Sequence, residues 1–172
     1  TLASNLTLTA DSEIKFNSGS TLNYSGAELL LGKSLSLTGS GQLQNTNNLN
    51  LGDVNGKLKL SGISVAKVIT SADSLGLEID NDSTVSNLEV SNLLPVSITS
   101  GKILSGNITV NTGGTLEFSK TGTLAANVLM SGGTLVANES LTISGTLTQS
   151  GNISIDVDSA KTLSFGAGQI KT

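Results

Sequence analysis

The sequence has no cysteine, no histidine, no tryptophan and no arginine, and its only proline is Pro95. Without cysteine, the chain can form neither a disulfide framework nor a thiolate metal site. Aromatic residues account for 2% of the chain and hydrophobic residues for 37%, which is low for a packed globule. Small and turn-forming residues dominate instead, with 26 serines, 20 threonines, 16 asparagines and 20 glycines. A chain of 172 residues nevertheless suffices for a single domain, residues 1–172, with a sizeable core.

The positive charges are scattered along the chain. All nine are lysines, and the formal net charge is −4. Nucleic-acid binding needs a basic patch and usually stacking aromatics or arginine forks, so we exclude that class of function. No run of 18 apolar residues occurs, so we expect no membrane span, and no signal peptide opens the chain. We therefore expect residues 1–172 to be a mature or excised segment of a longer protein.

The segment Asn107–Met130 shows an internal repeat most clearly. It reads as three short apolar strands separated by polar or glycine turns, and the pattern that starts at Ile108 starts again at Val128. The period is 128 − 108 = 20 residues. Self-similarity at a fixed period of this size is typical of solenoids. Segments Asn5–Leu22 and Asn107–Leu124 also resemble one another across 107 − 5 = 102 residues.

The apolar residues fall into three faces that follow one another in fixed order. The first face takes Leu6, Leu8, Leu29, Leu31, Leu49, Leu51, Val68, Leu88, Val90, Ile108, Val110, Val128, Met130 and Leu147. The second takes Ile14, Phe16, Leu35, Leu37, Leu58, Leu60, Leu75, Leu77, Val96, Ile98, Leu116, Phe118, Leu135, Ile153 and Ile155. The third takes Leu22, Tyr24, Leu43, Ile63, Val65, Val85, Ile103, Leu124, Leu141, Ile143, Leu163 and Phe165.

Alternation within each strand indicates how the faces are oriented. Apolar residues alternate with polar ones, which places one side inward and the other in solvent. Glycine pairs such as Gly113-Gly114 and Gly132-Gly133 supply the positive φ angles that corners need. No segment has a sustained helical period. The sequence therefore predicts an all-β fold, a parallel β-helix (β-solenoid) of about eight three-sided coils of roughly 20 residues. At ~4.8 Å per coil, the rod would be ~40 Å long.

The spacing loosens between Ala66 and Ser100. This segment contains Asp80-Asn81-Asp82-Ser83 and Leu93-Leu94-Pro95. We interpret it as a longer corner loop, with a functional protrusion as the alternative. Proline cannot donate a hydrogen bond to a strand ladder, so Pro95 is expected at a strand start or a bulge.

Two short glycine-containing segments resemble a known class of proteins. Gly113-Gly114-Thr115-Leu116 and Gly132-Gly133-Thr134-Leu135, with their flanking Ser, Thr and Asn residues, resemble bacterial right-handed parallel β-helix surface proteins. Autotransporter passenger domains and filamentous-haemagglutinin-like adhesins are the types that look most similar. The resemblance implies right-handed coils, a secreted location on the bacterial cell surface, and a scaffold or adhesive role. It carries over no catalytic residue.

Two close aspartate pairs are the candidates for acid chemistry, Asp80 with Asp82 and Asp156 with Asp158. Alternate residues of a strand point the same way, so either pair would present two carboxylates on one face. Solvated charge that keeps the rod soluble is the main interpretation. Weak calcium binding and catalysis by a carbohydrate-processing β-helix enzyme are the alternatives, and a glycosidase would need its two carboxylates at a defined separation. We expect no catalytic residue and no cofactor.

Some apolar residues stand where polar ones are expected. The outward positions of the first face are Thr7, Leu30, Asn50, Ile69, Glu89, Thr109, Leu129 and Thr148. Charged and bulky residues interrupt this row, so we do not expect a threonine array that binds ice. Scattered exposed apolar residues are normal. If Leu30, Ile69 and Leu129 line up with Val136, they form a strip that packs against a flanking segment or another rod.

Three functional hypotheses follow from these patterns. The preferred one is a non-enzymatic, extracellular structural or adhesive domain of a bacterial surface protein or fibre, with a cell-surface or matrix ligand as partner. The second is a filament subunit that joins copies of itself through open coil ends or lateral packing. The third is a degenerate or weakly active carbohydrate-processing enzyme.

Overall fold

The computed structural model describes the chain except residues 5, 27–28, 31–32, 52–55, 167–169 and 172, and the side chains of residues 29, 30 and 171 also lie outside the described part. Its regular elements are all strands. No helix among the described residues is long and apolar enough to cross a membrane.

The strands form two sheets. The 8-stranded sheet contains, in spatial order, β1 (Ser12–Phe16), β4 (Leu35–Gly39), β7 (Leu58–Ser61), β9 (Leu77–Asn81), β11 (Leu93–Ile98), β13 (Thr115–Phe118), β16 (Thr134–Ala137) and β19 (Ser154–Val157). The main path of the 13-stranded sheet contains β2 (Thr21–Tyr24), β5 (Gln42–Asn45), β8 (Ser64–Thr70), β10 (Ser83–Val90), β12 (Ile103–Val110), β14 (Gly122–Leu124), β17 (Leu141–Ile143) and β20 (Leu163–Phe165). Its remaining strands are β3 (Leu29–Leu30), β6 (Leu49–Asn50), β15 (Asn127–Met130), β18 (Leu147–Gln149) and β21 (Ile170–Lys171).

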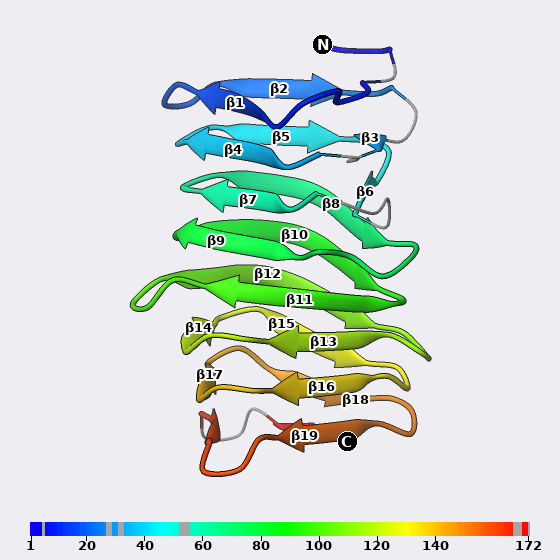
Figure 1. The fold of residues 1–172 in the computed structure, drawn as a ribbon, viewed down its shortest axis with the longest axis vertical. Helices are drawn as coiled ribbons and strands as arrows, with labels where there is room; N and C mark the ends of the chain where they lie inside the picture. Colours follow the sequence, from blue (N-terminus) through cyan, green and yellow to red (C-terminus); the bar gives the residue numbers. More distant parts are fainter. Residues whose placement is uncertain (5, 27–28, 31–32, 52–55, 167–169, 172) are drawn as a thin grey trace.

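All the strand pairings in the described part are parallel, and each joins one coil to the next. The stack has the N-terminus at one end and the C-terminal strands at the other (Figure 1). The 8-stranded sheet is the predicted second face. The 13-stranded sheet combines the third and first faces, because β8, β10 and β12 each run through the corner between them. The eight strands on the main path of this sheet, one per coil, make about seven full turns, close to the eight coils predicted.

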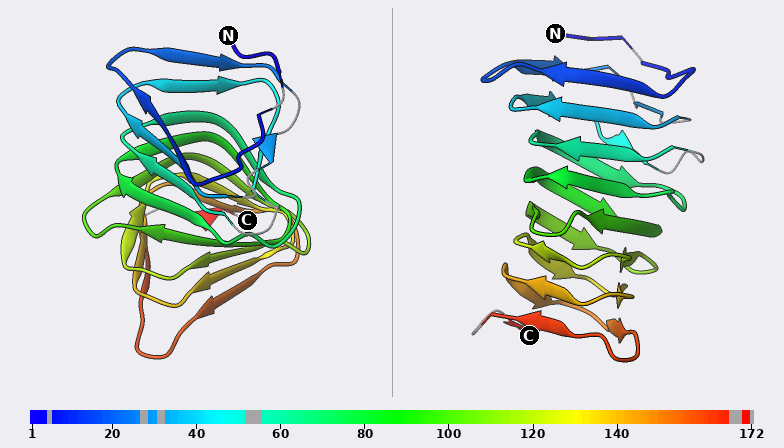
Figure 2. Two further views of the ribbon diagram at one scale, coloured as in Figure 1. Left: turned by 45° about the horizontal axis from the view of Figure 1, so that its top comes forward. Right: turned by 60° about the vertical axis from the view of Figure 1, so that its left-hand side comes forward.

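The coils turn in the predicted direction. In the left view of Figure 2, where the N-terminal end comes forward, the chain runs clockwise along β1 and β2 and then moves away from the viewer. A path that turns clockwise as it recedes is right-handed. The fold is therefore a right-handed parallel β-helix, as predicted.

The length of a coil varies more than the predicted period. Ser12 pairs with Leu35, a step of 35 − 12 = 23 residues. Leu58 pairs with Leu77, a step of 77 − 58 = 19 residues. Corners absorb most of the extra residues and the strands keep their register, apart from one bulge between β7 and β9 and one between β10 and β12.

Aliphatic ladders fill the interior. Leu35, Leu58 and Leu77 occupy successive coils in register, and each is 0% exposed. Burial of such a side chain stabilises the fold by ~1.5–3 kcal/mol relative to leaving it exposed. Like residues therefore stack on one another and exclude water with few aromatics, although Phe118 is also fully buried.

Two predicted core positions are wrong. The sequence pattern predicts Ile103 in the third face, but Ile103 is 38% exposed, while its neighbour Leu104 is 1% exposed and pairs with Leu124. The pattern predicts Leu75 in the second face, but Leu75 is 49% exposed. The inward pair of that coil is Leu77 with Ile79, which pair with Leu58 and Leu60 of β7.

The prediction of a long corner loop between Ala66 and Ser100 is also wrong. The segment contains the end of β8 and the whole of β9, β10 and β11, and it includes a coil step of only 96 − 77 = 19 residues, from Leu77 to Val96. Pro95 lies inside β11 rather than at its start, and it pairs with Glu117 of β13. Pairing of β11 with β9 begins at the next residue, Val96. The missing N–H of Pro95 thus coincides with the point where pairing to β9 starts.

Side-chain oxygens continue the bonding between coils beyond the strand ends. Asp11 Oδ1 accepts a hydrogen bond from the backbone N–H of Ser34 at 2.9 Å. Asp73 Oδ1 accepts one from the backbone N–H of Leu93 at 3.2 Å. Each acceptor lies on one coil and each donor on the next. Corner N–H groups that lack a ladder partner are satisfied in this way.

Candidate binding surface

The predicted outward row of the first face exists as a ladder. The register joins its members in the order Leu30, Asn50, Ile69, Glu89, Thr109, Leu129 and Thr148. Leu30 contributes its backbone to β3, and its side chain lies outside the described part. Asn50 is buried and bonded to Ser71. Glu89 and Thr109 separate Ile69 from Leu129, so the apolar members do not touch along the ladder.

Val136 does not join this row. It belongs to β16 in the 8-stranded sheet, where it pairs with Glu117 and Asp156. Leu129 belongs to β15 in the 13-stranded sheet. A single apolar strip through Leu30, Ile69, Leu129 and Val136 is therefore not present, because its members lie on two different faces.

A shallow, neutral hollow of about 330 Å³ lies over the outward side of β12, β15 and the approach to β18. Its lining side chains come from two adjacent rows of the first face. One row is the asparagine ladder, which we define as Asn107, Asn127 and Thr146. The other is the outward row at Thr109, Leu129 and Thr148. The lining contains no charged residue, and Leu129 is 37% exposed.

Hydrogen bonds hold the asparagine ladder in one orientation. Thr146 Oγ1 donates to Asn127 Oδ1 at 2.9 Å. Asn127 Nδ2 donates to Asn107 Oδ1 at 3.2 Å, and Asn107 Nδ2 donates to the Ser86 carbonyl at 3.1 Å. All these bonds point toward the N-terminal end, so each polarises the next. An asparagine amide carries two donor hydrogens, so each amide retains one beyond the bond it makes in the ladder.

Reasoning from the sequence missed this ladder. Its members share one sequence position, directly before Ile108, Val128 and Leu147 at the start of the first face. That position was available as a signal. The orientation of the amides depends on side-chain contacts between coils, which periodicity does not describe.

The Asp156–Asp158 pair borders a second hollow, of about 300 Å³, lined also by Val136, Asn138, Val157 and Ser159. Asp158 Oδ1 accepts a hydrogen bond from the backbone N–H of Ser159 at 2.7 Å. Both carboxylates are exposed. Oxygen ligands of this kind suit calcium, and the side chains of the hollow that carry oxygen are Asn138, Asp156, Asp158 and Ser159.

Asp80 and Asp82 are arranged differently. Leu60 pairs with Ile79 and Ser61 pairs with Asn81, so Asp80 is the extra residue of a β-bulge. The bulge interrupts the alternation on which a shared face for Asp80 and Asp82 was predicted. Asp82 Oδ1 instead accepts a hydrogen bond from the backbone N–H of Ile103 at 3.0 Å. Among the described residues, no group of three or more acidic, histidine or cysteine side chains could hold a metal ion.

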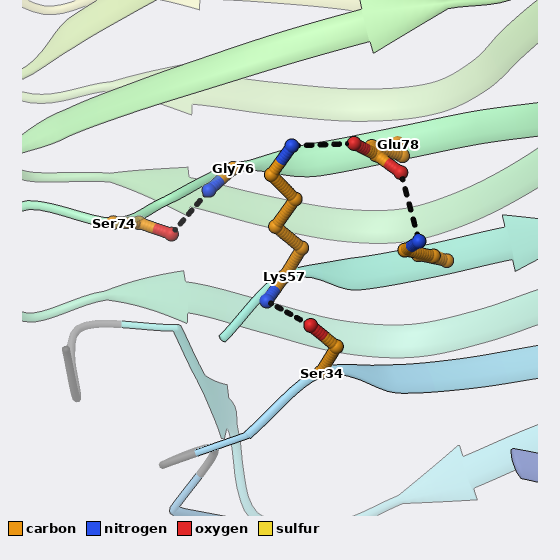
Figure 3. Close-up of polar contacts among 6 residues, drawn as sticks. Ser34, Lys57, Ser74, Gly76 and Glu78 are labelled. Atoms are coloured by element: carbon orange, nitrogen blue, oxygen red, sulfur yellow. Dashed lines mark hydrogen bonds and ion pairs between the residues drawn. The ribbon is translucent and has the colours of Figure 1, made fainter. Parts of the chain in front are cut away.

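A charge cluster lies on the outward side of the 8-stranded sheet. Lys57 Nζ lies 2.6 Å from Glu78 Oε1, and Lys59 Nζ lies 3.5 Å from Glu78 Oε2. The Lys57 backbone N–H also donates to Ser34 Oγ of the previous coil at 3.3 Å (Figure 3). The hydrogen bond from Lys57 lowers the pKa of Glu78, partial burial opposes that shift, and the charges of Lys57 and Lys59 reinforce it.

We expect this cluster to make stability depend on pH in acid. A carboxylate with a lowered pKa stabilises the fold above its ordinary value of 4.5 and loses that effect as the pH falls through the lower folded value. The difference in free energy of unfolding between the wild type and Glu78→Gln should therefore be largest at neutral pH, at less than ~1 kcal/mol, and should shrink below pH 4.5. Urea denaturation from pH 3 to pH 7 measures it. A difference that stays constant over this range would contradict the assignment.

No protein-family model, curated protein or solved structure matches this chain. The parallel β-helix thus rests on the strand register of the chain itself. That this chain belongs to the bacterial surface proteins, which its glycine-containing segments resemble, remains a proposal.

Proposed function

We propose that the chain is a non-enzymatic structural and adhesive segment of a bacterial extracellular surface protein or fibre. The observation that carries this proposal is the unbroken parallel stacking of coils, each bonded to the next along one axis. Such a stack has a fixed length per coil, ~4.8 Å, so it holds a contact surface at a set distance from its base. The partner is a cell-surface or matrix ligand.

The repetition of the coils supports an adhesive role. Outward residues recur at the same position on successive coils, as Asn107 and Asn127 do. A ligand with its own repeat meets several equivalent groups along the axis, and many weak contacts add up to useful avidity. Gly113, with a φ of 82°, and Gly132, with a φ of 122°, have the positive φ angles predicted for the glycine corners, and the segments that contain them resemble passenger domains and haemagglutinin-like adhesins.

One observation favours the filament alternative. At the C-terminal end of the stack, inward residues are left in solvent: Ile155 is 41% exposed, Val157 39% and Ile170 58%. Their partners one coil earlier, Leu135, Ala137 and Leu147, are at most 2% exposed. A further layer of parallel strands would cover these residues, and a second copy of the chain is one source of that layer.

A combined binding and cleavage assay tests the proposed function. Beads that carry the full chain are expected to adhere to surfaces coated with matrix proteins or polysaccharides, and the polysaccharides should keep their original chain length. Shortened polysaccharide, with shortening lost in Asp156→Asn or Asp80→Asn, would overturn the non-enzymatic assignment. Sedimentation of the full chain separates the two structural alternatives. A single species independent of concentration favours the adhesive segment, and growth with concentration favours the filament.

A further inference from the structure

We propose that the neutral hollow lined by Asn107, Thr109, Asn127, Leu129, Thr146 and Thr148 is a binding site for a neutral glycan. This inference rests on the proposed adhesive function and names its ligand class. Four features of the hollow support a neutral glycan as the ligand: its lack of charge, its hydrogen-bonding groups, its apolar floor and the paired backbone beneath it.

The absence of charge in the lining selects among ligands. An anionic polymer would find no lysine there, and a cation would find no carboxylate. A charged residue follows the hollow on each side of the outward row. Glu89 pairs with Thr109 one coil away and accepts a hydrogen bond from Asn87 Nδ2. Lys171, whose side chain lies outside the described part, pairs with Thr148 one coil away in the other direction. The Glu89 carboxylate would repel an anionic polymer that extended past the hollow toward β10.

The polar groups of the hollow match sugar hydroxyls. Asn127 uses one amide hydrogen on Asn107, and its other hydrogen remains for a ligand. Thr109 and Thr148 add hydroxyls that both donate and accept. A sugar hydroxyl also donates and accepts, so it can pair with either kind of group. Because the asparagine ladder is already oriented by its own bonds, a ligand loses little side-chain entropy on binding it.

Leu129 provides the apolar contact. It lies between Thr109 and Thr148 in the outward row and is 37% exposed. Sugar rings carry C–H faces that pack on an aliphatic surface while their hydroxyls point to the sides. The asparagine ladder and the outward row lie two residues apart, ~6.7 Å along the strand, so polar groups flank and surround Leu129.

The backbone beneath the hollow disfavours a peptide strand as the ligand. Asn107 to Val110 of β12 pair with Asn127 to Met130 of β15, and Val128 to Met130 pair in turn with Leu147 to Gln149 of β18. The N–H and C=O groups of these strands are therefore bonded to neighbouring coils. A peptide that adds a strand needs a free sheet edge, and this face offers only side chains.

Affinity electrophoresis of the full chain tests the proposal. The probes are two neutral polysaccharides, dextran and galactomannan, with anionic alginate for comparison. We expect a neutral polysaccharide to retard the chain and alginate to have no effect. Asn127→Ala removes a ladder amide and should raise the Kd at least about fivefold. The matched control is Asn23→Ala, which changes an exposed outward asparagine of the same sheet outside the hollow.

Each outcome decides the question, provided that circular dichroism shows both variants folded. Retardation by neither neutral polysaccharide, or equal retardation of the wild type and Asn127→Ala, would overturn the site. Retardation by alginate alone would also overturn it. If neither neutral polysaccharide retards the chain but beads coated with it still adhere to matrix proteins, the glycan site fails while the adhesive function stands. Shortening of polysaccharide in the cleavage assay would instead remove the proposed function itself.

Discussion

Gly106→Ala is expected to lower the free energy of unfolding by about 2–4 kcal/mol, more than a substitution at an exposed position would. Gly106 lies within β12, where the chain passes from the third face to the first, and it pairs with Val85 of β10. Its φ is 122°, a conformation that residues with a side chain rarely adopt. A Cβ at this position would lie 1.8 Å from the Val85 carbonyl oxygen. Both strands belong to the ladder, so neither can move without loss of register.

Gly101→Ala is the matched control for this prediction. Gly101 also has a positive φ, 74°, but a Cβ there would meet nothing within 4 Å. It should cost only the strain of the left-handed conformation, about 1–2 kcal/mol. Urea denaturation with a common m-value measures both variants. Equal losses would show that conformational strain alone, and not the contact with Val85, makes glycine necessary at position 106.

The fold was predictable because a solenoid repeats one pattern. Leu58 and Leu116 occupy inward positions of the same sheet in different coils, and each coil has to bury an equivalent residue. Periodicity at about 20 residues therefore carries the fold, even where coil lengths run from 19 to 23 residues. The right-handed turn of the coils was predicted only from the resemblance of the glycine-containing segments to known right-handed proteins.

The predicted orientation of a side chain is wrong where two apolar residues are adjacent in the sequence. Ile103 and Leu104 are neighbours, so alternation alone allows either one to point inward. The pairing of Leu104 with Ser83 and Leu124 decides the register. The prediction for Leu75 is wrong for a different reason. Leu75, Leu77 and Ile79 have the spacing of alternate residues in a strand, but β9 begins only at Leu77.

The candidate surface was predictable only in part. The outward row with Ile69 and Leu129 follows from the period, since the strands keep register. The hollow does not follow from it, because its shape depends on how Asn107 and Asn127 bond across coils. Asp80 was misjudged because a β-bulge adds one residue to the strand, and a bulge leaves no mark in the apolar pattern.

The register at β12 can be tested with two adjacent residues. Leu104 is 1% exposed and contacts the coils on both sides, so Leu104→Ala removes buried side-chain atoms and leaves a cavity. We expect it to cost about 2–5 kcal/mol of unfolding free energy. Ile103 is 38% exposed, and Ile103→Ala should cost less than about 1 kcal/mol, mostly through lower strand propensity.

A register shift of one residue would reverse which of the two variants loses more unfolding free energy. A strand shifted by one position would bury Ile103 and expose Leu104, since neighbouring side chains point to opposite sides of a sheet. Thermal or urea unfolding of the two variants under the same conditions gives the two values. A larger loss for Ile103→Ala than for Leu104→Ala would show that β12 pairs with β10 and β14 in the other register, and the bend at Gly106 would then lie one residue away from its place opposite Val85.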